Sequence, residues 1–361
     1  MDPNLPSDSP PPPSYIVAEA VTPLPPPAPR RRFRWFGSLL LILLLLALGG
    51  SILLNLVLVA FSFPFDSERR VREKFFSHER WAKDKVAIVS IKGVIVGSDD
   101  GFVKRQIDQA IKDEAVKAVV LRVDSPGGTV SGSDYYYHHL RKLLDKREIP
   151  MVVSMGSVAA SGGYYVSMAA GPRPDTIFAE PTTWTGSIGV VIPHYNVGEL
   201  LGKLGITEDP VASGPLKNMG SFARAMNEEE RRIFRSLVDD GFTRFKDVIK
   251  QGRPKFREDP KALDKLASGQ IYSADQAQQN GLVDRIGYLE EAVDRAIELA
   301  GLDPDQVRVV KYQPEIDLFD ALFGMESRRS GLDLSALWDL SSPRAYYLST
   351  RLPILMSSEA R

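Results

Sequence analysis

The segment from Pro150 to Tyr165 reads PMVVSMGSVAASGGYY and passes from an apolar run into small residues and a glycine pair. Its apolar start at Pro150–Val153 predicts a buried strand, so Ser161 lies where a strand passes into a helix. A helix N-terminus offers unpaired N–H groups and a positive dipole end, which suit an oxyanion, and small neighbours let a carbonyl approach closely. The segment therefore indicates a serine nucleophile, provided that a base activates its hydroxyl.

Apolar runs and helical periodicities alternate along the chain on both sides of this segment. We predict strands at 86–91, 118–123, 150–153, 176–179 and 187–192, and helices at 102–112, 132–146, 227–250, 273–281 and 286–300. Asn227 is the expected N-cap of the long helix, and Gly281 the expected stop of the short one. Strands alternating with helices predict an α/β fold with parallel strand pairing.

Composition excludes several classes of function. The chain has 361 residues, of which 43% are hydrophobic and 25% charged, and its net charge of −1 gives no electrostatic argument for nucleic-acid binding. It contains no cysteine, which rules out disulfides, thiolate nucleophiles and iron–sulfur clusters. Its four histidines show no metal-ligand spacing, so neither a metal nor a cofactor is expected.

The N-terminal part has the organisation of a tail followed by a membrane anchor. A proline-rich stretch and four arginines precede an uncharged run at 35–65, whose apolar core Leu39–Phe61 would span about 34 Å as a helix. That core is longer than the apolar region of a signal peptide, although Leu58–Ala60 resembles a cleavage site. The sequence therefore predicts a single transmembrane helix, with cleavage as the alternative.

The arginines before the anchor favour an N-terminus on the cytoplasmic side, although the basic residues at 69–74 reduce the charge difference across it. We therefore predict a single-pass protein of the inner (cytoplasmic) membrane with an extracytoplasmic catalytic domain. The predicted organisation is a disordered proline-rich tail with a basic flank at 1–34, an anchor at 35–65, a linker at 66–84, a catalytic domain at 85–301 and a partly ordered extension at 302–361.

A second glycine-rich turn, Ser125–Gly128, closes the predicted strand 118–123. Glycine permits a positive φ, so a backbone N–H of this turn can face inward and join that of Gly162 in an oxyanion hole. The alternative is an ordinary tight turn before a helix.

The residues alone leave the base open. His138 and His139 are triad candidates, although the neighbouring tyrosines indicate a packed helix face. Lys217 lies in a Gly/Pro loop, where an ordinary solvated lysine is the alternative. A free lysine has a pKa of about 10.4, so a catalytic one must be made neutral by burial, with a hydroxyl such as that of Ser187 holding the amine.

Five motifs, in this order, make the region from about Val86 to Ala300 closely resemble the signal peptide peptidase A (protease IV) family. They are Ser125–Gly128, Met155–Tyr165, Thr185–Val190, Ser213–Ser221 and Gly269–Asp284. The resemblance implies a fold like those of Clp protease and crotonase and a Ser/Lys dyad. In that dyad Ser161 is the nucleophile, Lys217 the general base and Ser187 the residue that positions the lysine. It also implies that Gly128 and Gly162 hold the oxyanion.

The resemblance further implies an endopeptidase that cleaves remnant signal peptides at the bilayer and assembles into a homo-oligomeric ring. In short members of the family, the lysine of one subunit serves the serine of its neighbour. The loop Gly171–Asp175 is longer than is usual in the family, which is expected to alter the rim of the pocket. The alternative functions are a crotonase-type enzyme acting on acyl-CoA and a catalytically silent membrane scaffold.

Overall fold

The structure is a computed structural model that describes residues 32–62, 71–97, 99, 101–315 and 346–348, in two units divided between Ser67 and Glu68. The described part of the first unit is α1 (Arg32–Ser62). Among the described residues, no helix combines the length and the apolarity needed to cross a bilayer. The predicted anchor at 35–65 overlaps this helix, and residues 1–31 of the predicted tail lie outside the described residues.

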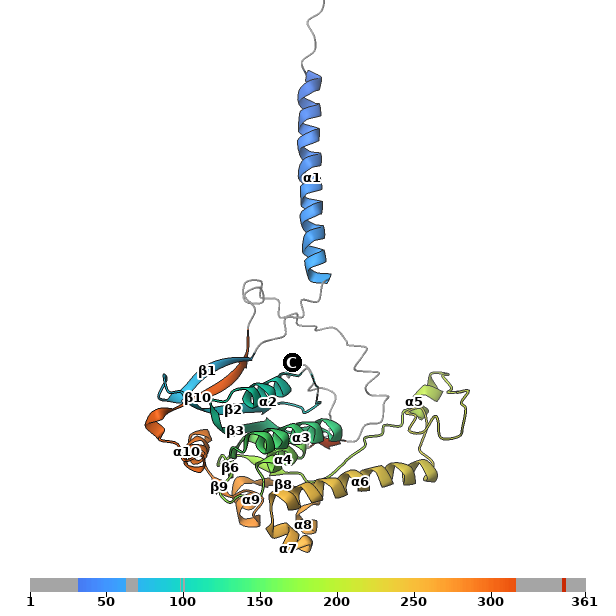
Figure 1. Cartoon of the computed structure of the whole chain (residues 1–361). Coiled ribbons are helices and arrows are strands. Elements are labelled where there is room, and N and C mark those ends of the chain that lie inside the picture. The colour runs from blue at the N-terminus through green and yellow to red at the C-terminus, as the bar shows by residue number, and fades with distance from the viewer. Residues whose placement is uncertain (1–31, 63–70, 98, 100, 316–345, 349–361) are drawn as a thin grey trace, which may run out of the picture. The chain divides into compact units, whose positions relative to one another are not determined.

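The second unit is built on a nine-stranded, mostly parallel sheet with the order β1-β10-β2-β3-β5-β6-β9, to which β7 and β8 are added beside β5 (Figure 1). Antiparallel pairs occur only between β1 and β10 and between β7 and β8 of this described sheet. The predicted α/β fold with parallel pairing is confirmed. The strands are β1 (Val71–His78), β2 (Asp84–Lys92), β3 (Val116–Ser125), β5 (Met151–Ala160), β6 (Ile177–Ala179), β7 (Trp184–Gly186), β8 (Ile271–Ser273), β9 (Arg285–Ile286) and β10 (Val307–Pro314).

Helices cover both faces of this sheet, because its central strands alternate buried apolar side chains between two cores. One core joins the sheet to α2, α3, α4 and α6, and the other joins it to α10 (Figure 1). The helices are α2 (Phe102–Lys112), α3 (Val130–Arg147), α4 (Gly162–Ser167), α5 (Gly198–Lys203), α6 (Glu228–Gly252), α7 (Lys255–Glu258), α8 (Pro260–Leu266), α9 (Ala274–Asn280) and α10 (Leu289–Leu299).

Local chemistry explains where the helices begin and end. The Asn227 side chain accepts from the Glu230 N–H, and the Glu230 carboxylate accepts from the Asn227 N–H, so α6 begins with a capping box. Gly281 ends α9 in the left-handed conformation at φ 72°. Both the predicted cap and the predicted stop are confirmed.

Two features of the fold differ from the sequence prediction. The strand predicted at 187–192 is wrong, because β7 ends at Gly186 and Ser187 adopts a φ of 49°, which turns the chain out of the sheet. The sheet also extends beyond the range 85–301 at both ends. Strand β1 lies in the predicted linker and β10 in the predicted extension, and they pair with each other.

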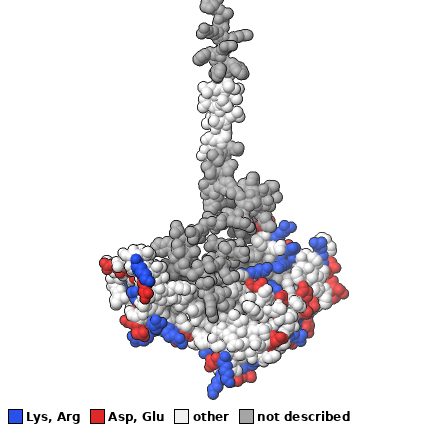
Figure 2. All heavy atoms as spheres, turned by 180° about the vertical axis from the view of Figure 1, so that it is seen from behind, with Lys and Arg blue, Asp and Glu red and all other residues white. Residues whose placement is uncertain are grey.

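Figure 2 shows acidic and basic side chains interspersed over the described surface of the face seen from behind. Neither sign forms a continuous stripe along a groove on that described surface. This distribution agrees with the net charge of −1 and with the absence of a nucleic-acid signal in the sequence.

Candidate active site

Ser161 is the single residue between β5 and α4, and its backbone is strained. Its φ of 54° and ψ of −112° lie in a region that L-residues rarely occupy. Two backbone hydrogen bonds hold it there: its N–H donates to the Gly186 carbonyl at 2.8 Å, and its carbonyl accepts from the Tyr165 N–H at 2.9 Å. The residue is 1% exposed, and its Oγ has no hydrogen-bond partner among the described residues. A buried hydroxyl is thus presented without a partner at the predicted position.

The backbone amides of Gly128 and Gly162 lie next to each other beside this serine. Gly128 belongs to the short strand β4 (Gly127–Thr129), and Gly162 is the first residue of α4. A Cβ placed on Gly162 would lie only 3.1 Å from the Gly128 amide nitrogen, and one placed on Gly128 would lie 1.8 Å from the Ile95 carbonyl oxygen. Only glycine permits this approach. The first N–H groups of a helix have no intrahelical partner, so the arrangement suits an oxyanion.

Ser187 lies close to Ser161 because β7 pairs with the end of β5. Ala160 is in register with Gly186, the residue that precedes Ser187. The Ser187 N–H donates to the Gln270 carbonyl at 2.7 Å, and the residue is 7% exposed. The structure therefore brings the two predicted serines and the two predicted glycines to one place.

Lys217 is not part of that cluster within one chain. It is exposed, and it lies in a turn between α5 and α6 where its N–H donates to the Gly214 carbonyl at 3.1 Å. In Figure 1 the segment around α5 lies beyond the N-terminal end of α6, outside the layers formed by the sheet and its helices. Within the described residues, the Lys217 amine makes no hydrogen bond or ion pair with Ser161 or Ser187.

The two histidine candidates lie elsewhere, on α3. The His139 ring packs against Tyr135 at 4.4 Å between centroids and against His138 at 5.2 Å. Burial, followed by the charge of Lys104, lowers the pKa of His139. Neither histidine contacts Ser161 in the described structure, and Tyr136 and Tyr137 beside them are buried. The reading of this helix as a packed face is confirmed.

A short C-terminal strand, β11 (Tyr346–Leu348), lies against the glycine-rich strand. It pairs antiparallel with β4, with Tyr347 opposite Gly128. On its other side, Tyr346 and Val191 exchange two backbone hydrogen bonds of 2.9 and 3.0 Å. Sequence reasoning missed this strand, because no local pattern identifies its distant pairing partners.

The Tyr347 side chain is fully buried in an aromatic pocket. Its ring stacks on Tyr165 at 5.1 Å and tilts against Phe245 at 4.6 Å, and its hydroxyl donates to the Gly241 carbonyl at 2.7 Å. The pocket is thus formed by α4, which follows Ser161, and by α6. It accepts a side chain from an extended strand that lies along β4.

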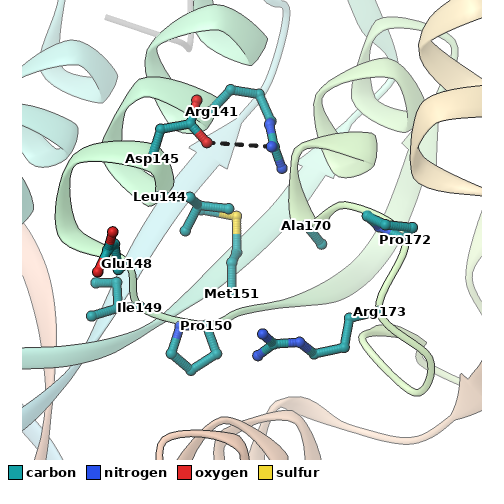
Figure 3. Close-up of a pocket in the computed structure, with 10 residues that line it drawn as sticks. All are labelled: Arg141, Leu144, Asp145, Glu148, Ile149, Pro150, Met151, Ala170, Pro172 and Arg173. Atoms are coloured by element: carbon teal, nitrogen blue, oxygen red, sulfur yellow. Dashed lines mark hydrogen bonds and ion pairs between the residues drawn. The ribbon is translucent and has the colours of Figure 1, made fainter.

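A separate pocket of about 570 Å³ lies at the other end of β5 (Figure 3). Its lining includes Pro150 and Met151, where β5 begins, and Arg141, whose guanidinium pairs with Asp145. The 171–175 loop contributes two residues to this pocket. That loop therefore shapes a concavity away from Ser161 and not, as expected, the rim beside it.

Sequence reasoning also missed the polar network around Lys217. Arg224 donates two hydrogen bonds, of 2.5 and 3.0 Å, to the Glu230 carboxylate and a third, of 2.9 Å, to the carbonyl of Asn218, the residue after Lys217. Glu208 accepts from the Asn218 amide at 3.0 Å. The glutamates after Asn227 indicated the start of a helix, but nothing in that pattern indicated that Arg224 pairs with Glu230.

Hydrogen bonding from Arg224 lowers the pKa of Glu230 below its ordinary value. Since the folded pKa lies below that of the unfolded chain, the ionised carboxylate contributes stability that is complete above the unfolded pKa of about 4.3 and is lost as pH falls through the folded value. We expect the difference in melting temperature between the wild type and Glu230→Gln to be largest near neutrality and to shrink below about pH 4. An equal difference at about pH 3 and about pH 7 would contradict this linkage.

Comparisons with known proteins identify similar chains. The model of peptidase family S49 matches residues 144–303. A protein of Synechocystis sp. named as a protease is 36% identical, over 68% of this chain and 85% of its own length. One from Enterococcus faecium named as signal peptide peptidase SppA is 36% identical, over 66% and 70%. Protease 4 of Haemophilus influenzae is 34% identical, over 62% of this chain and 36% of its own length.

Proposed function

Because the chain belongs to the signal peptide peptidase A family (peptidase family S49) and is a serine peptidase, we propose that Ser161 is its nucleophile and that Lys217 of a neighbouring copy is its base. One observation carries this proposal. Among the described residues, the Ser161 hydroxyl is buried without a partner beside two amides, whereas the lysine of the same chain is exposed on a loop and makes no hydrogen bond or ion pair with Ser161. A head-to-tail ring supplies such a lysine from the next subunit.

The reaction follows from these positions. The neutral Lys217 amine takes the proton of Ser161 as Oγ forms a bond to the peptide carbonyl carbon. The carbonyl oxygen becomes an alkoxide that accepts from the N–H groups of Gly128 and Gly162. The protonated lysine then donates to the leaving amine as the C–N bond breaks. Water, losing a proton to the same amine, hydrolyses the ester. In this proposal Ser187, near Ser161, accepts a hydrogen bond from the incoming amine.

An extended peptide is the substrate that the β4 edge supports. Strand β11 is held there by main-chain pairing on both sides, which is how a peptide adds to a sheet edge. Since β11 occupies this edge, a substrate must replace it. The pocket filled by Tyr347 favours an aromatic or large apolar side chain.

The finer expectations from the family resemblance also belong to this proposal. The parallel run β2-β3-β5-β6 supports a fold like those of Clp protease and crotonase. The uncharged run at 35–65 supports a single-pass anchor with the N-terminus in the cytoplasm, and remnant signal peptides are the substrates that such an anchor would bring within reach. Labelling Ser161 with a membrane-impermeant fluorophosphonate in intact and in lysed cells tests the chemistry and the orientation together.

Mixing two inactive variants tests the shared site. Ser161→Ala subunits retain the lysine and Lys217→Ala subunits retain the serine. Random mixing in a ring should therefore restore about a quarter of the wild-type sites. Peptide hydrolysis by subunits unfolded and refolded together measures the recovery, and each variant refolded alone is the control. No recovery from fully assembled mixed rings would show that the dyad is not divided between subunits.

Loss of the Tyr347 side chain is expected to activate the enzyme. Tyr347→Ala removes the stacking and the hydrogen bond that hold β11 on β4, so the free form becomes more abundant. We expect KM for a peptide substrate to fall by about tenfold, because apparent affinity scales with the competent fraction. Trp81→Ala, which removes an exposed aromatic side chain, is the control. An unchanged or higher KM in a folded Tyr347→Ala protein would refute a role for β11 as an occupant of the substrate edge.

A further inference from the structure

We propose that Arg224 and Glu230 are positioning residues. They hold residues 189–229, called here the Lys217 segment, in the shape in which the Lys217 amine enters the active site of the neighbouring subunit. The inference rests on the proposed role of Lys217 as a base given to another subunit. It adds that the base is delivered by a preorganised loop, with α6 as the fixed support.

The Lys217 segment is not held by an apolar core. None of the residues 189–229 is buried in the structure. Helix α5, within this stretch, contributes no buried residue either. A segment of this length without apolar burial is mobile unless polar contacts fix it. The contacts on either side of Lys217 therefore decide whether its amine has a defined position.

Those contacts converge on the residue next to the lysine. Asn218 is fixed twice: its carbonyl accepts from Arg224, and its side-chain amide donates to Glu208. Ser221 is fixed by donation to the same Glu208 carboxylate, at 2.8 Å, and by His194 Nε2, which lies 3.0 Å from its carbonyl oxygen. The backbone is held directly after Lys217, while the lysine side chain has no hydrogen-bond or ion-pair partner among the described residues.

Glu230 connects this network to the rigid part of the molecule. Its side chain is 0% exposed. Its carboxylate accepts from the Asn227 N–H, which caps α6, and from two N–H groups of the Arg224 guanidinium. Helix α6 is in turn packed into the main core through Phe245 and Val248. Arg224 therefore links a buried point on α6 to the carbonyl beside the lysine.

The geometry requires an arginine. A guanidinium offers a planar fork to a carboxylate and a further N–H for the Asn218 carbonyl, whereas a lysine amine is a point charge on a flexible stem. Arg224→Lys keeps the charge but loses the fork, so it is expected to rescue activity only partly. Glu230→Gln keeps the shape of the side chain and the cap but loses the charge.

Mixed rings separate positioning from general stability. Adding Arg224→Gln to the Ser161→Ala chain, which donates the lysine, is expected to lower the recovered activity at least tenfold. Adding it to the Lys217→Ala chain, which donates the serine, should leave recovery within twofold. Arg235→Gln on α6, which breaks an exposed pair with Asp239, is the matched control for either chain. The inference would be overturned if Arg224→Gln lowered the recovered activity equally in the two chains, or lowered it in neither.

A second measurement decides the question whichever chain supplies the lysine. With Arg224→Gln or Glu230→Gln in every subunit, kcat should fall at least tenfold with KM unchanged and with assembly retained, and Arg224→Lys should recover part of kcat. An unchanged kcat, or a loss that appears only in KM, would overturn positioning. If the mixture of Ser161→Ala and Lys217→Ala chains recovers no activity, the result rejects only the proposal that the dyad is divided between subunits.

Discussion

Replacing Ser161 by alanine is expected to lower kcat for peptide hydrolysis by about 10⁶-fold, as removal of a serine nucleophile does when the oxyanion donors are left in place. In the proposed mechanism the Ser161 Oγ forms the acyl bond, and Ser187, which follows β7, positions the amine. Initial rates on a peptide ester measure the loss. A residual kcat within tenfold of the wild type, in a folded and assembled protein, would remove Ser161 from the proposed mechanism.

The same replacement is expected to preserve or raise stability. A buried hydroxyl without a partner costs about 1–3 kcal/mol, and a residue held in a rare backbone region costs a similar amount. Ser161→Ala removes the first cost, and Ser161→Gly also relieves the φ of 54°. The melting temperature should therefore rise from the wild type through the alanine to the glycine variant, with both variants inactive. An alanine variant less stable than the wild type would contradict the cost assigned to the buried hydroxyl, and a glycine variant no more stable than the alanine variant would contradict strain at φ 54°.

Ser161 and its neighbours were predictable because their signals are local. Residues 150–165 contain the apolar strand, the small residues and the glycine pair within one continuous stretch. The long helix was likewise marked by Asn227 and the acidic residues after it, and the structure has both its cap and its first turn as predicted. The family resemblance, which rests on several such local motifs in order, is confirmed by the comparisons.

Long-range pairing could not be predicted in this way. Strands β1 and β10 pair although they are more than two hundred residues apart in the sequence, and β11 pairs with β4 across a similar sequence separation. Periodicity identifies a strand but not its neighbour. Ser187 was predicted in a strand because 187–192 is largely apolar and β-branched, whereas in the structure its φ is 49° and its N–H donates to the Gln270 carbonyl. Within one chain Lys217 is exposed on a loop and makes no hydrogen bond or ion pair with Ser161 among the described residues, and no local pattern indicates such a separation.

Gly162→Ala is expected to lower kcat by about 10²- to 10³-fold, the size of effect of one oxyanion donor, because the alanine keeps the N–H but displaces it. The new Cβ would lie 2.4 Å from Ser133 Oγ and 3.2 Å from the Gly127 Cα, so its surroundings must move. Ser133 cannot rotate away freely, because its hydroxyl donates to the Thr129 carbonyl at 2.9 Å and the residue is fully buried. The shift is therefore expected to separate α4 from β4 and to spread the two amides that are proposed to receive the alkoxide.

Overpacking of this kind also costs about 1–3 kcal/mol of folding free energy, so stability alone cannot identify the cause of a lost rate. Gly202→Ala is the matched control, because a Cβ there meets nothing within 4 Å. The diagnostic result is a kcat loss in Gly162→Ala at a temperature where the protein is still fully folded, with KM changed little, since β4 still offers its edge to the peptide. Folded Gly162→Ala rings with the wild-type kcat would show that the amide of α4 does not hold the oxyanion, and the nucleophile would then need another set of donors.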